Sequence, residues 1–308
     1  MTTYLVTGAA GFIGSSLAKA LIKIGHEVVT IDNLSTGLKS NIPEGVIFYK
    51  GDCADPNIYK RLEDYQFDAI FHIAGQSSGE ISFDDPIYDV KTNTESTLLL
   101  LKFAIERHCK RFIYASTMSV YGAHPEISVK EETNCQPKSF YGVGKLASEN
   151  YLSIYEDYGL KTTSLRLFNV YGPGQNLENL RQGMVSIFLA QLIKEGSIHV
   201  KGSGSRFRDF IYIDDVVDVF IKCLEYEETF GEIINVGTGK KTSIHNLINK
   251  LLEISKINAP IKYSGSTSGD IHGIYADVTK CKRIFNNQKF TSLSEGLHRM
   301  WNWANNLN

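Results

Sequence analysis

Short apolar runs alternate with longer amphipathic stretches through the first half of the chain. The apolar runs lack strict alternation, which is typical of strands buried on both faces of a parallel sheet. The stretches between them place apolar residues at helical spacing. This β-α-β order predicts an α/β fold, a doubly wound parallel sheet with helices on both faces. The predicted strands cover residues 4–7, 27–31, 46–49, 69–72, 112–115 and 162–167, and the long predicted helices cover 90–108 and 142–158.

The pattern changes in the second half. A Gly-Pro-Gly break at 172–174 interrupts it, and helical spacing returns at 214–226 and 243–254. We therefore expect a sheet domain over residues 1–172. A smaller C-terminal substrate lobe mainly covers 173–308, and it stays open whether the chain crosses between the two more than once.

Composition excludes several classes of protein. With 308 residues, 43% of them hydrophobic and 21% charged, the chain is predicted to fold into a globular protein. Its net charge of −2 gives no electrostatic reason to expect nucleic acid or a membrane surface as a partner. No apolar run reaches the ~20 residues of a membrane span. Five scattered cysteines without a C-x-x-C pair favour a reduced, cytoplasmic protein, and the histidine spacing predicts no metal site.

Three glycines lie between the first predicted strand and the following helix. Gly8 permits a tight turn, Gly11 lets the backbone approach a pyrophosphate, and Gly14 lets helix and strand pack closely. Phe12 and Ile13 open the helix, whose first N–H groups face the phosphates. The strand–glycine–helix context predicts a dinucleotide site of the Rossmann type.

An acidic residue follows at the expected distance. Asp32 ends the second predicted strand, where its carboxylate can accept hydrogen bonds from the adenosine ribose hydroxyls. No arginine follows it to hold a 2′-phosphate, which favours NAD over NADP. Asp52, after the third strand, is expected near the adenine, together with the neighbouring Asn33 and Cys53.

Tyr141 and Lys145 form a Tyr-x-x-x-Lys pair at the start of a predicted helix. Side chains at i and i+4 share a helix face, so both can serve one site. A phenol with a pKa of about 10 is a poor base at neutral pH, and a nearby ammonium favours the phenolate. The hydroxyl donor expected beside the pair is Thr117 or Ser116, at the carboxyl end of a strand.

These motifs resemble the extended short-chain dehydrogenases/reductases, and within them the NAD-dependent nucleotide-sugar epimerases and dehydratases. The closest resemblance is to the UDP-glucose (UDP-galactose) 4-epimerase branch. The resemblance covers nearly the whole chain. Its landmarks are Gly8, Gly11 and Gly14, residues 32–37, Gly51 and Asp52, 71–74, Asn93, 120–122, Tyr141 and Lys145, 166–174, 208–210, 235–237, and Gly269 with Asp270.

The resemblance implies a role for each matching residue. Tyr141 is the expected acid/base, Lys145 its activator and Thr117 the partner of the reacting hydroxyl. Beyond the residues already named, Ala74 and Asn93 complete the expected cofactor site. The expected substrate-binding residues are Ser116, Thr117, Asn169, Arg206, Arg208 and His272. The resemblance also implies a homodimer through helices 90–108 and 142–158, and polysaccharide biosynthesis as a context.

Two features bear on the choice of branch. The family usually carries an arginine at the position of Thr267, so His272 or Arg206 is expected to replace that diphosphate contact. Related dehydratases carry an acid after the catalytic threonine, where this chain has Met118 and Ser119. This favours epimerisation with NAD and a UDP-sugar. A dehydratase, an NAD(P)H-dependent reductase and a non-enzymatic dinucleotide-binding regulator remain the alternatives, and the sugar stays open.

Overall fold

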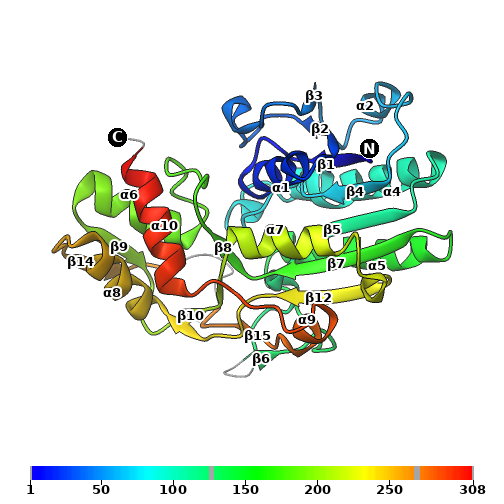
Figure 1. The fold of residues 1–308 in the computed structure, drawn as a ribbon. Coiled ribbons are helices and arrows are strands. Elements are labelled where there is room, and N and C mark those ends of the chain that lie inside the picture. The colour runs from blue at the N-terminus through cyan, green and yellow to red at the C-terminus, as the bar shows by residue number, and fades with distance from the viewer. Residues whose placement is uncertain (1, 125–127, 267–270, 307–308) are drawn as a thin grey trace.

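The computed structural model describes residues 2–124, 128–266 and 271–306. A twisted sheet of seven parallel strands forms its centre, in the order β12-β7-β5-β4-β1-β2-β3 (Figure 1). This is the doubly wound α/β fold expected from the sequence. The strands are β1 (Thr3–Thr7), β2 (Glu27–Asp32), β3 (Ile47–Lys50), β4 (Ala69–His72), β5 (Arg111–Thr117), β7 (Lys161–Leu167) and β12 (Glu232–Val236).

Helices cover both faces of the sheet, because side chains of successive strand residues point to opposite faces. Val6 of β1 packs in one apolar core and Leu5 in the other. The first core includes side chains of α1 (Phe12–Lys23) and α7 (Ile213–Lys222). The second includes α4 (Ser96–Glu106) and α5 (Phe140–Glu156). The absence of alternation in the strands is thus explained by burial on both sides.

The C-terminal half adds a smaller group of elements beside the sheet (Figure 1). Its core is continuous with the α1–α7 face of the sheet. Both α7 and β12 return to the sheet from beyond residue 173, and β12 pairs with β7. The remaining elements are α2 (Asn57–Lys60), α6 (Met184–Glu195), α8 (Ile244–Ser255), α9 (Thr279–Ile284), α10 (Leu293–Asn305), β6 (Ser128–Val129), β8 (Asn169–Tyr171), β9 (Ile198–Lys201), β10 (Phe207–Arg208), β11 (Phe210–Tyr212), β13 (Thr242–Ser243), β14 (Ile261–Ser264) and β15 (Tyr275–Ala276).

The two long helices begin earlier than predicted. The helix expected at 90–108 starts as α3 (Pro86–Val90), because the Asp85 carboxylate accepts a hydrogen bond from the Tyr88 N–H and proline fits the first helical position. It continues through a π-helical turn, Lys91–Glu95, into α4. Helix α5 starts two residues before the predicted 142, because Ser139 accepts a hydrogen bond from the Gly142 N–H at 3.1 Å.

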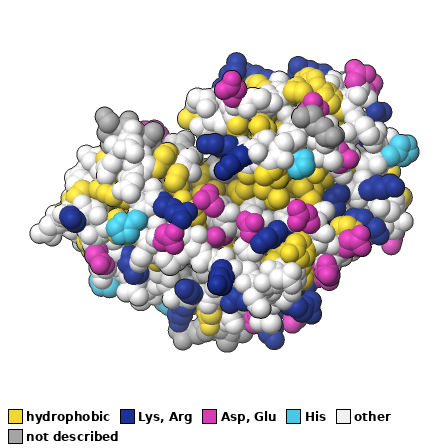
Figure 2. All heavy atoms as spheres, in the orientation of Figure 1, with side chains coloured by type: hydrophobic (Ala, Val, Ile, Leu, Met, Phe, Trp, Pro, Cys, Tyr) yellow, Lys and Arg dark blue, Asp and Glu magenta, His cyan; other side chains and the backbone are white. Residues whose placement is uncertain are grey.

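The surface carries charges of both signs. Lys and Arg side chains are interspersed with Asp and Glu on the face drawn in Figure 2. Across the described parts of the chain, none of the helices combines the length and apolar character needed to cross a membrane.

Candidate functional site

The carboxyl ends of four parallel strands meet at one edge of the sheet. Thr7, Asp32, His72 and Thr117 end β1, β2, β4 and β5. In open α/β sheets ligands bind at this edge. The turns after these strands therefore contribute to one candidate site, which comprises a cofactor pocket and the group around Tyr141. A basic cluster comes from the second half of the chain.

Close backbone approach explains the glycines after β1. Gly8 has a φ of +78°, and a Cβ there would lie 2.9 Å from the Ala74 backbone. A Cβ at Gly14 would lie 2.2 Å from the Gly8 carbonyl oxygen, so only glycine fits. Helix α1 begins after Gly11 with no side-chain cap among the described residues. Its first N–H groups can therefore hold a phosphate, as a dinucleotide requires.

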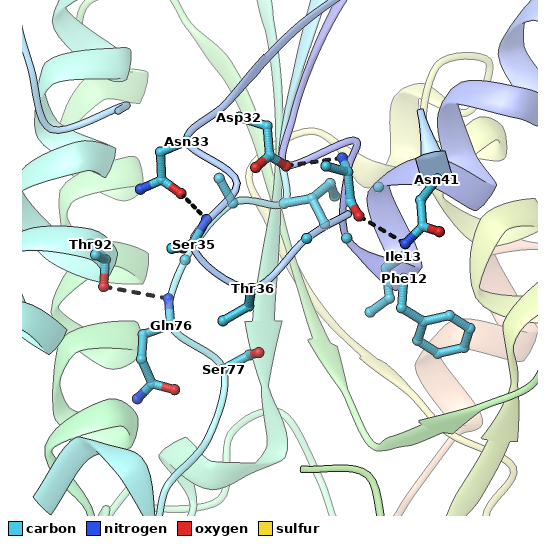
Figure 3. Close-up of a pocket in the computed structure, with 18 of the residues that line it drawn as sticks. Phe12, Ile13, Asp32, Asn33, Ser35, Thr36, Asn41, Gln76, Ser77 and Thr92 are labelled. Atoms are coloured by element: carbon cyan, nitrogen blue, oxygen red, sulfur yellow. Dashed lines mark hydrogen bonds between the residues drawn. The ribbon is translucent and has the colours of Figure 1, made fainter. Parts of the chain in front are cut away.

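Hydrogen bonds orient the carboxylates of the adenosine end. Asp32 accepts hydrogen bonds from the Ala10 N–H at 2.9 Å and the Leu34 N–H at 2.8 Å. Figure 3 shows the first bond, with the Asp32 carboxylate at the pocket wall. Asp52 accepts from the Ala54 N–H at 2.8 Å and from Asn33 Nδ2 at 3.3 Å. Each carboxylate is thus fixed, with lone pairs left for a ribose or an adenine.

Ten of the predicted cofactor residues line one pocket: Gly8, Gly11, Phe12, Ile13, Gly14, Asp32, Asn33, Asp52, Cys53 and Ala74. Sequence reasoning missed further lining residues, namely Ser35, Thr36, Asn41, Gln76, Ser77 and Thr92, and the segment 174–182 through Gly174, Gln175, Asn176, Asn179 and Gln182. Residues 35–36 belong to the landmark at 32–37 and could have been found there. Gly174 likewise ends the landmark at 166–174, whereas residues 175–182 reach the pocket from the second half of the chain and have no local signal. The glycine cradle, the uncapped helix and Asp32 together fit NAD.

A buried histidine holds the glycine turn against the end of β4. Thr7 Oγ1 accepts the N–H groups of Ile73 and Ala74, so its own proton goes to His72 Nδ1 at 2.9 Å. His72 Nε2 must then donate to Thr97 Oγ1 at 3.1 Å. Burial lowers the pKa of His72 to about 3, with the Lys145 charge adding to it. His72 is therefore neutral and structural.

Tyr141, Lys145 and Thr117 lie together beside the pocket. Burial raises the pKa of Tyr141 to about 12, and a hydrogen bond with the Thr117 side chain opposes this rise. Burial lowers the pKa of Lys145 to about 8. Lys145 Nζ donates to the Ala115 carbonyl at 2.9 Å and lies 6.0 Å from the centre of the Tyr141 ring. The ammonium and the hydroxyl donor are both placed to stabilise a phenolate.

Asn93, the third residue of the π-helical turn, lies at the same place. Its Nδ2 donates to the Gln76 carbonyl at 2.9 Å. Its Oδ1 is buried without a hydrogen-bond partner among the described residues. A Cβ at Gly75 would lie 2.4 Å from this oxygen and 3.6 Å from Lys145 Nζ. Asn93 is therefore beside Lys145, although it does not line the cofactor pocket.

Ser116 has a different environment from Thr117. Its hydroxyl donates to a Glu149 carboxylate oxygen inside the protein. Glu149 also forms a buried ion pair with Arg166, with 2.7 Å between Nη2 and Oε2. Thr117, and not Ser116, is therefore the hydroxyl next to Tyr141, a distinction that strand alternation could not make.

The predicted substrate residues of the second half meet where β8, β10 and β11 lie together. Asn169 begins β8, and its Oδ1 is buried without a partner in the described residues. Arg208 is 4% exposed and donates to the carbonyls of Phe207 at 2.7 Å and Ile271 at 3.1 Å. Burial, and then the charge of the neighbouring Arg206, lower its pKa to about 10. Arg208 and the neighbouring Arg206 thus form a basic cluster, and a guanidinium group can bind a diphosphate.

Arg206 and His272 are less enclosed than Arg208. Arg206 is half-buried, with its Nε donating to the Ser203 carbonyl at 3.1 Å. His272 is exposed, and its ring lies 5.6 Å from that of Phe207. Thr267, Gly269 and Asp270 lie outside the described residues. Ile274 is fully buried, in a cluster with Phe168 and Tyr121.

Comparison with known proteins gives a consistent result. The family model described as NAD dependent epimerase/dehydratase matches residues 4–237. A UDP-glucose 4-epimerase of Mycolicibacterium smegmatis is 34% identical over 302 residues, covering 95% of each chain. The crystal structure of a UDP-glucose 4-epimerase from Thermotoga maritima with UDP-glucose matches with a TM-score of 0.95 at 34% identity and covers 99% of both chains. A UDP-glucuronic acid 4-epimerase from Bacillus cereus in complex with UDP-glucuronic acid and NAD matches with a TM-score of 0.91 at 30% identity over 100% of both.

Proposed function

Because the chain belongs to the NAD-dependent epimerase/dehydratase family, we propose that it is an NAD-dependent nucleotide-sugar epimerase that inverts C4 of a UDP-hexose. The observation that carries this proposal is the group of Tyr141, Lys145 and Thr117 next to a pocket built for a dinucleotide. When bound, NAD takes up a hydride from the sugar carbon and returns it. The protein supplies orientation and proton transfer.

Tyr141 is the acid/base of the proposed reaction. As a phenolate it takes the proton of the sugar hydroxyl, and it returns that proton at the end of the cycle. Lys145 holds a positive charge near the phenolate, and Thr117 donates a hydrogen bond to it or to the sugar hydroxyl. Asn169, Arg206 and Arg208 hold the diphosphate while the oxidised sugar turns to present its other face.

The residues after β5 favour epimerisation over dehydration. Thr117 is followed by a 3-10 turn, Met118–Val120, whose side chains carry no acid. A dehydratase needs a second acid here to protonate the leaving hydroxyl, and residues 118–120 do not provide one.

The proposal is tested by proton NMR of the purified protein with UDP-glucose, UDP-N-acetylglucosamine and UDP-glucuronic acid, each without added cofactor. We expect a second, epimeric anomeric signal that grows to equilibrium with one of them, and no growth with Tyr141→Phe, which keeps the ring but removes the proton. A 4-keto-6-deoxy product would identify a dehydratase. Stoichiometric use of added NAD(P)H would identify a reductase. An absence of any turnover difference between the wild type and Tyr141→Phe would support the non-enzymatic dinucleotide-binding regulator.

We also propose that the enzyme is a homodimer in the cytoplasm that supplies sugars for polysaccharide synthesis. Large apolar side chains are exposed on neighbouring helices, Ile87 on α3 (78% exposed) and Val143 and Ile154 on α5 (54% each). Five free cysteines suit a reducing compartment. Light scattering of the wild type and of a Val143→Glu, Ile154→Glu variant tests the dimer, and an unchanged mass would contradict this interface. Cell fractionation tests the compartment.

A further inference from the structure

One buried carboxylate near the catalytic centre is not used in the mechanism above. Asp89, in α3, is fully buried. Its Oδ1 accepts hydrogen bonds from Gln76 Nε2 at 2.8 Å and Asn93 Nδ2 at 3.2 Å. Its Oδ2 is buried without a hydrogen-bond partner in the described residues. A buried carboxylate is unfavourable unless a charge or further hydrogen bonds compensate it.

Asp89 packs against the helix that carries the catalytic pair. A Cβ at Gly144 would lie 3.5 Å from Asp89 Oδ2, so this oxygen faces α5 one residue before Lys145. Asn93 Oδ1 approaches the same region from the other side, near Gly75 and the lysine nitrogen. Asp89 is therefore hydrogen-bonded to Asn93, which lies beside Lys145, and to Gln76, which lies on the pocket wall in Figure 3.

The other charged and titratable groups around Lys145 have partners or are neutral. Glu149 is paired with Arg166 at 2.7 Å. His72 on β4 is a neutral acceptor from Thr7, and Tyr114 on β5 presents its ring to Lys145 Nζ at 4.6 Å. In the described residues, no Lys, Arg or His nitrogen forms an ion pair with Asp89 within 4.0 Å. Burial raises the pKa of the Asp89 carboxyl, and the charge of Lys145 is among the effects that oppose this rise.

We propose that Asp89 is the counter-ion of Lys145, a positioning residue that keeps the lysine charged and holds Asn93 and Gln76 against α5. The electrostatic effects on Lys145 and Tyr141 agree with this arrangement. The Asp89 charge favours the ammonium, which raises the pKa of Lys145 against the effect of burial. The same charge disfavours the phenolate and adds to the rise in the pKa of Tyr141.

Loss of the charge therefore has a defined sign. Both the ammonium of Lys145 and the phenol of Tyr141 become stronger acids, so both titrations move to lower pH. A residue with a purely structural role would lower the amount of folded enzyme without moving either titration. The test depends on the proposed function only where turnover is measured, because the titration of Lys145 is followed without a substrate.

The test compares Asp89→Asn with the wild-type holoenzyme by NMR of lysines labelled with carbon-13 at Cε. Lys145, with a pKa of about 8, titrates well below ordinary lysines and is assigned by its loss in Lys145→Met. We expect its midpoint to fall by about one pH unit in Asp89→Asn. The exposed Glu95→Gln, which removes the same charge from the adjacent turn, is the matched control and leaves the midpoint in place.

If Asp89→Asn does not fold, Asp89→Ala removes the charge without leaving an unpaired amide and gives the same expectation. An unchanged Lys145 midpoint in a folded variant overturns the proposal, whatever the substrate proves to be. With a substrate in hand, the whole pH profile of kcat should move to lower pH by the same amount. A drop in kcat at all pH values without that shift would contradict the assignment.

Discussion

The cofactor end and the basic cluster of Arg206 and Arg208 offer different kinds of group to a phosphate. At the cofactor end the cradle is backbone, with Gly8 and Gly14 allowing main-chain atoms to approach and the first turn of α1 presenting N–H groups. The basic cluster instead offers two guanidinium groups, and the carbonyls of Ser203, Phe207 and Ile271 orient them. One end has partial charges on rigid atoms, and the other has full charges on long side chains.

The difference has a functional reason. In the proposed reaction NAD is regenerated in each turnover and stays bound, so a shape-determined backbone cradle suits it. The nucleotide sugar must enter and leave, and its hexose must turn while the diphosphate is held. In this proposal Arg208 of β10 and Arg206, which precedes that strand, provide strong but exchangeable contacts.

The largest effect is expected where the backbone cradle is filled. In Gly14→Ala the new Cβ would meet the Gly8 carbonyl at 2.2 Å, and the turn between β1 and α1 must move. We expect a loss of about 3 kcal/mol in the free energy of unfolding and of most bound NAD. Gly79→Ala is the control, because its Cβ meets only Ser139 Oγ at an ordinary 3.6 Å. Full NAD occupancy in Gly14→Ala, measured by absorbance of the purified protein, would refute the cradle.

The second effect separates the two ends. Arg208→Lys keeps the charge but removes the planar fork, so UDP affinity should fall by about 2 kcal/mol while NAD stays bound. Titration calorimetry with UDP measures the first quantity and absorbance the second. Gln182→Leu, at the wall of the cofactor pocket, is the opposite probe and should leave UDP affinity unchanged. Equal losses of both ligands in Arg208→Lys would show that the two ends are not independent.

How far the sequence predicts each end follows from where its groups lie in the chain. Gly8, Gly14 and Asp32 belong to one β-α-β unit, and Tyr141 and Lys145 to one helix, so spacing alone places them. Gln182 reaches the same pocket from a distant segment, and its position depends on packing between the sheet and the C-terminal elements. Sequence spacing carries no information on such a contact.

Two local details that spacing does not supply have the same origin. The apolar pattern predicted a helix at 90–108 but not its π-helical turn, because hydrophobic spacing does not register one extra residue in a turn. Ser116 was expected to bind substrate. Its hydroxyl instead donates to Glu149, a partner on a helix 33 residues away in sequence. Ser116 and Thr117 are adjacent hydroxyls, and only the tertiary structure distinguishes them.

The third effect is a loss of stability at acidic pH, which His72 at the cofactor end should cause. The pKa of His72 is about 3 in the folded protein and about 6.5 when unfolded, so the unfolded chain binds the extra proton between these values. The contribution of neutral His72 to the free energy of unfolding is therefore complete above pH 6.5. As the pH falls below this value, the contribution is lost by about 1.4 kcal/mol per pH unit. Denaturant unfolding at pH 6 and pH 5 should show this loss in the wild type but not in His72→Gln. The exposed His245→Gln should behave like the wild type.

The smallest effect is the most direct comparison of the two ends. Raising the salt from 0.05 M to 0.5 M shortens the screening length several-fold and weakens attraction between exposed charges. Arg208 is 4% exposed and should be screened little, whereas the half-buried Arg206 should be screened more. UDP affinity should therefore fall a few-fold, and Arg206→Gln should remove most of that dependence. NAD occupancy should change little over the same range, because its cradle has no side-chain cation to screen among the described pocket residues. A salt dependence as steep for NAD as for UDP would mean that distant charges, and not the local backbone or guanidinium groups, dominate both sites.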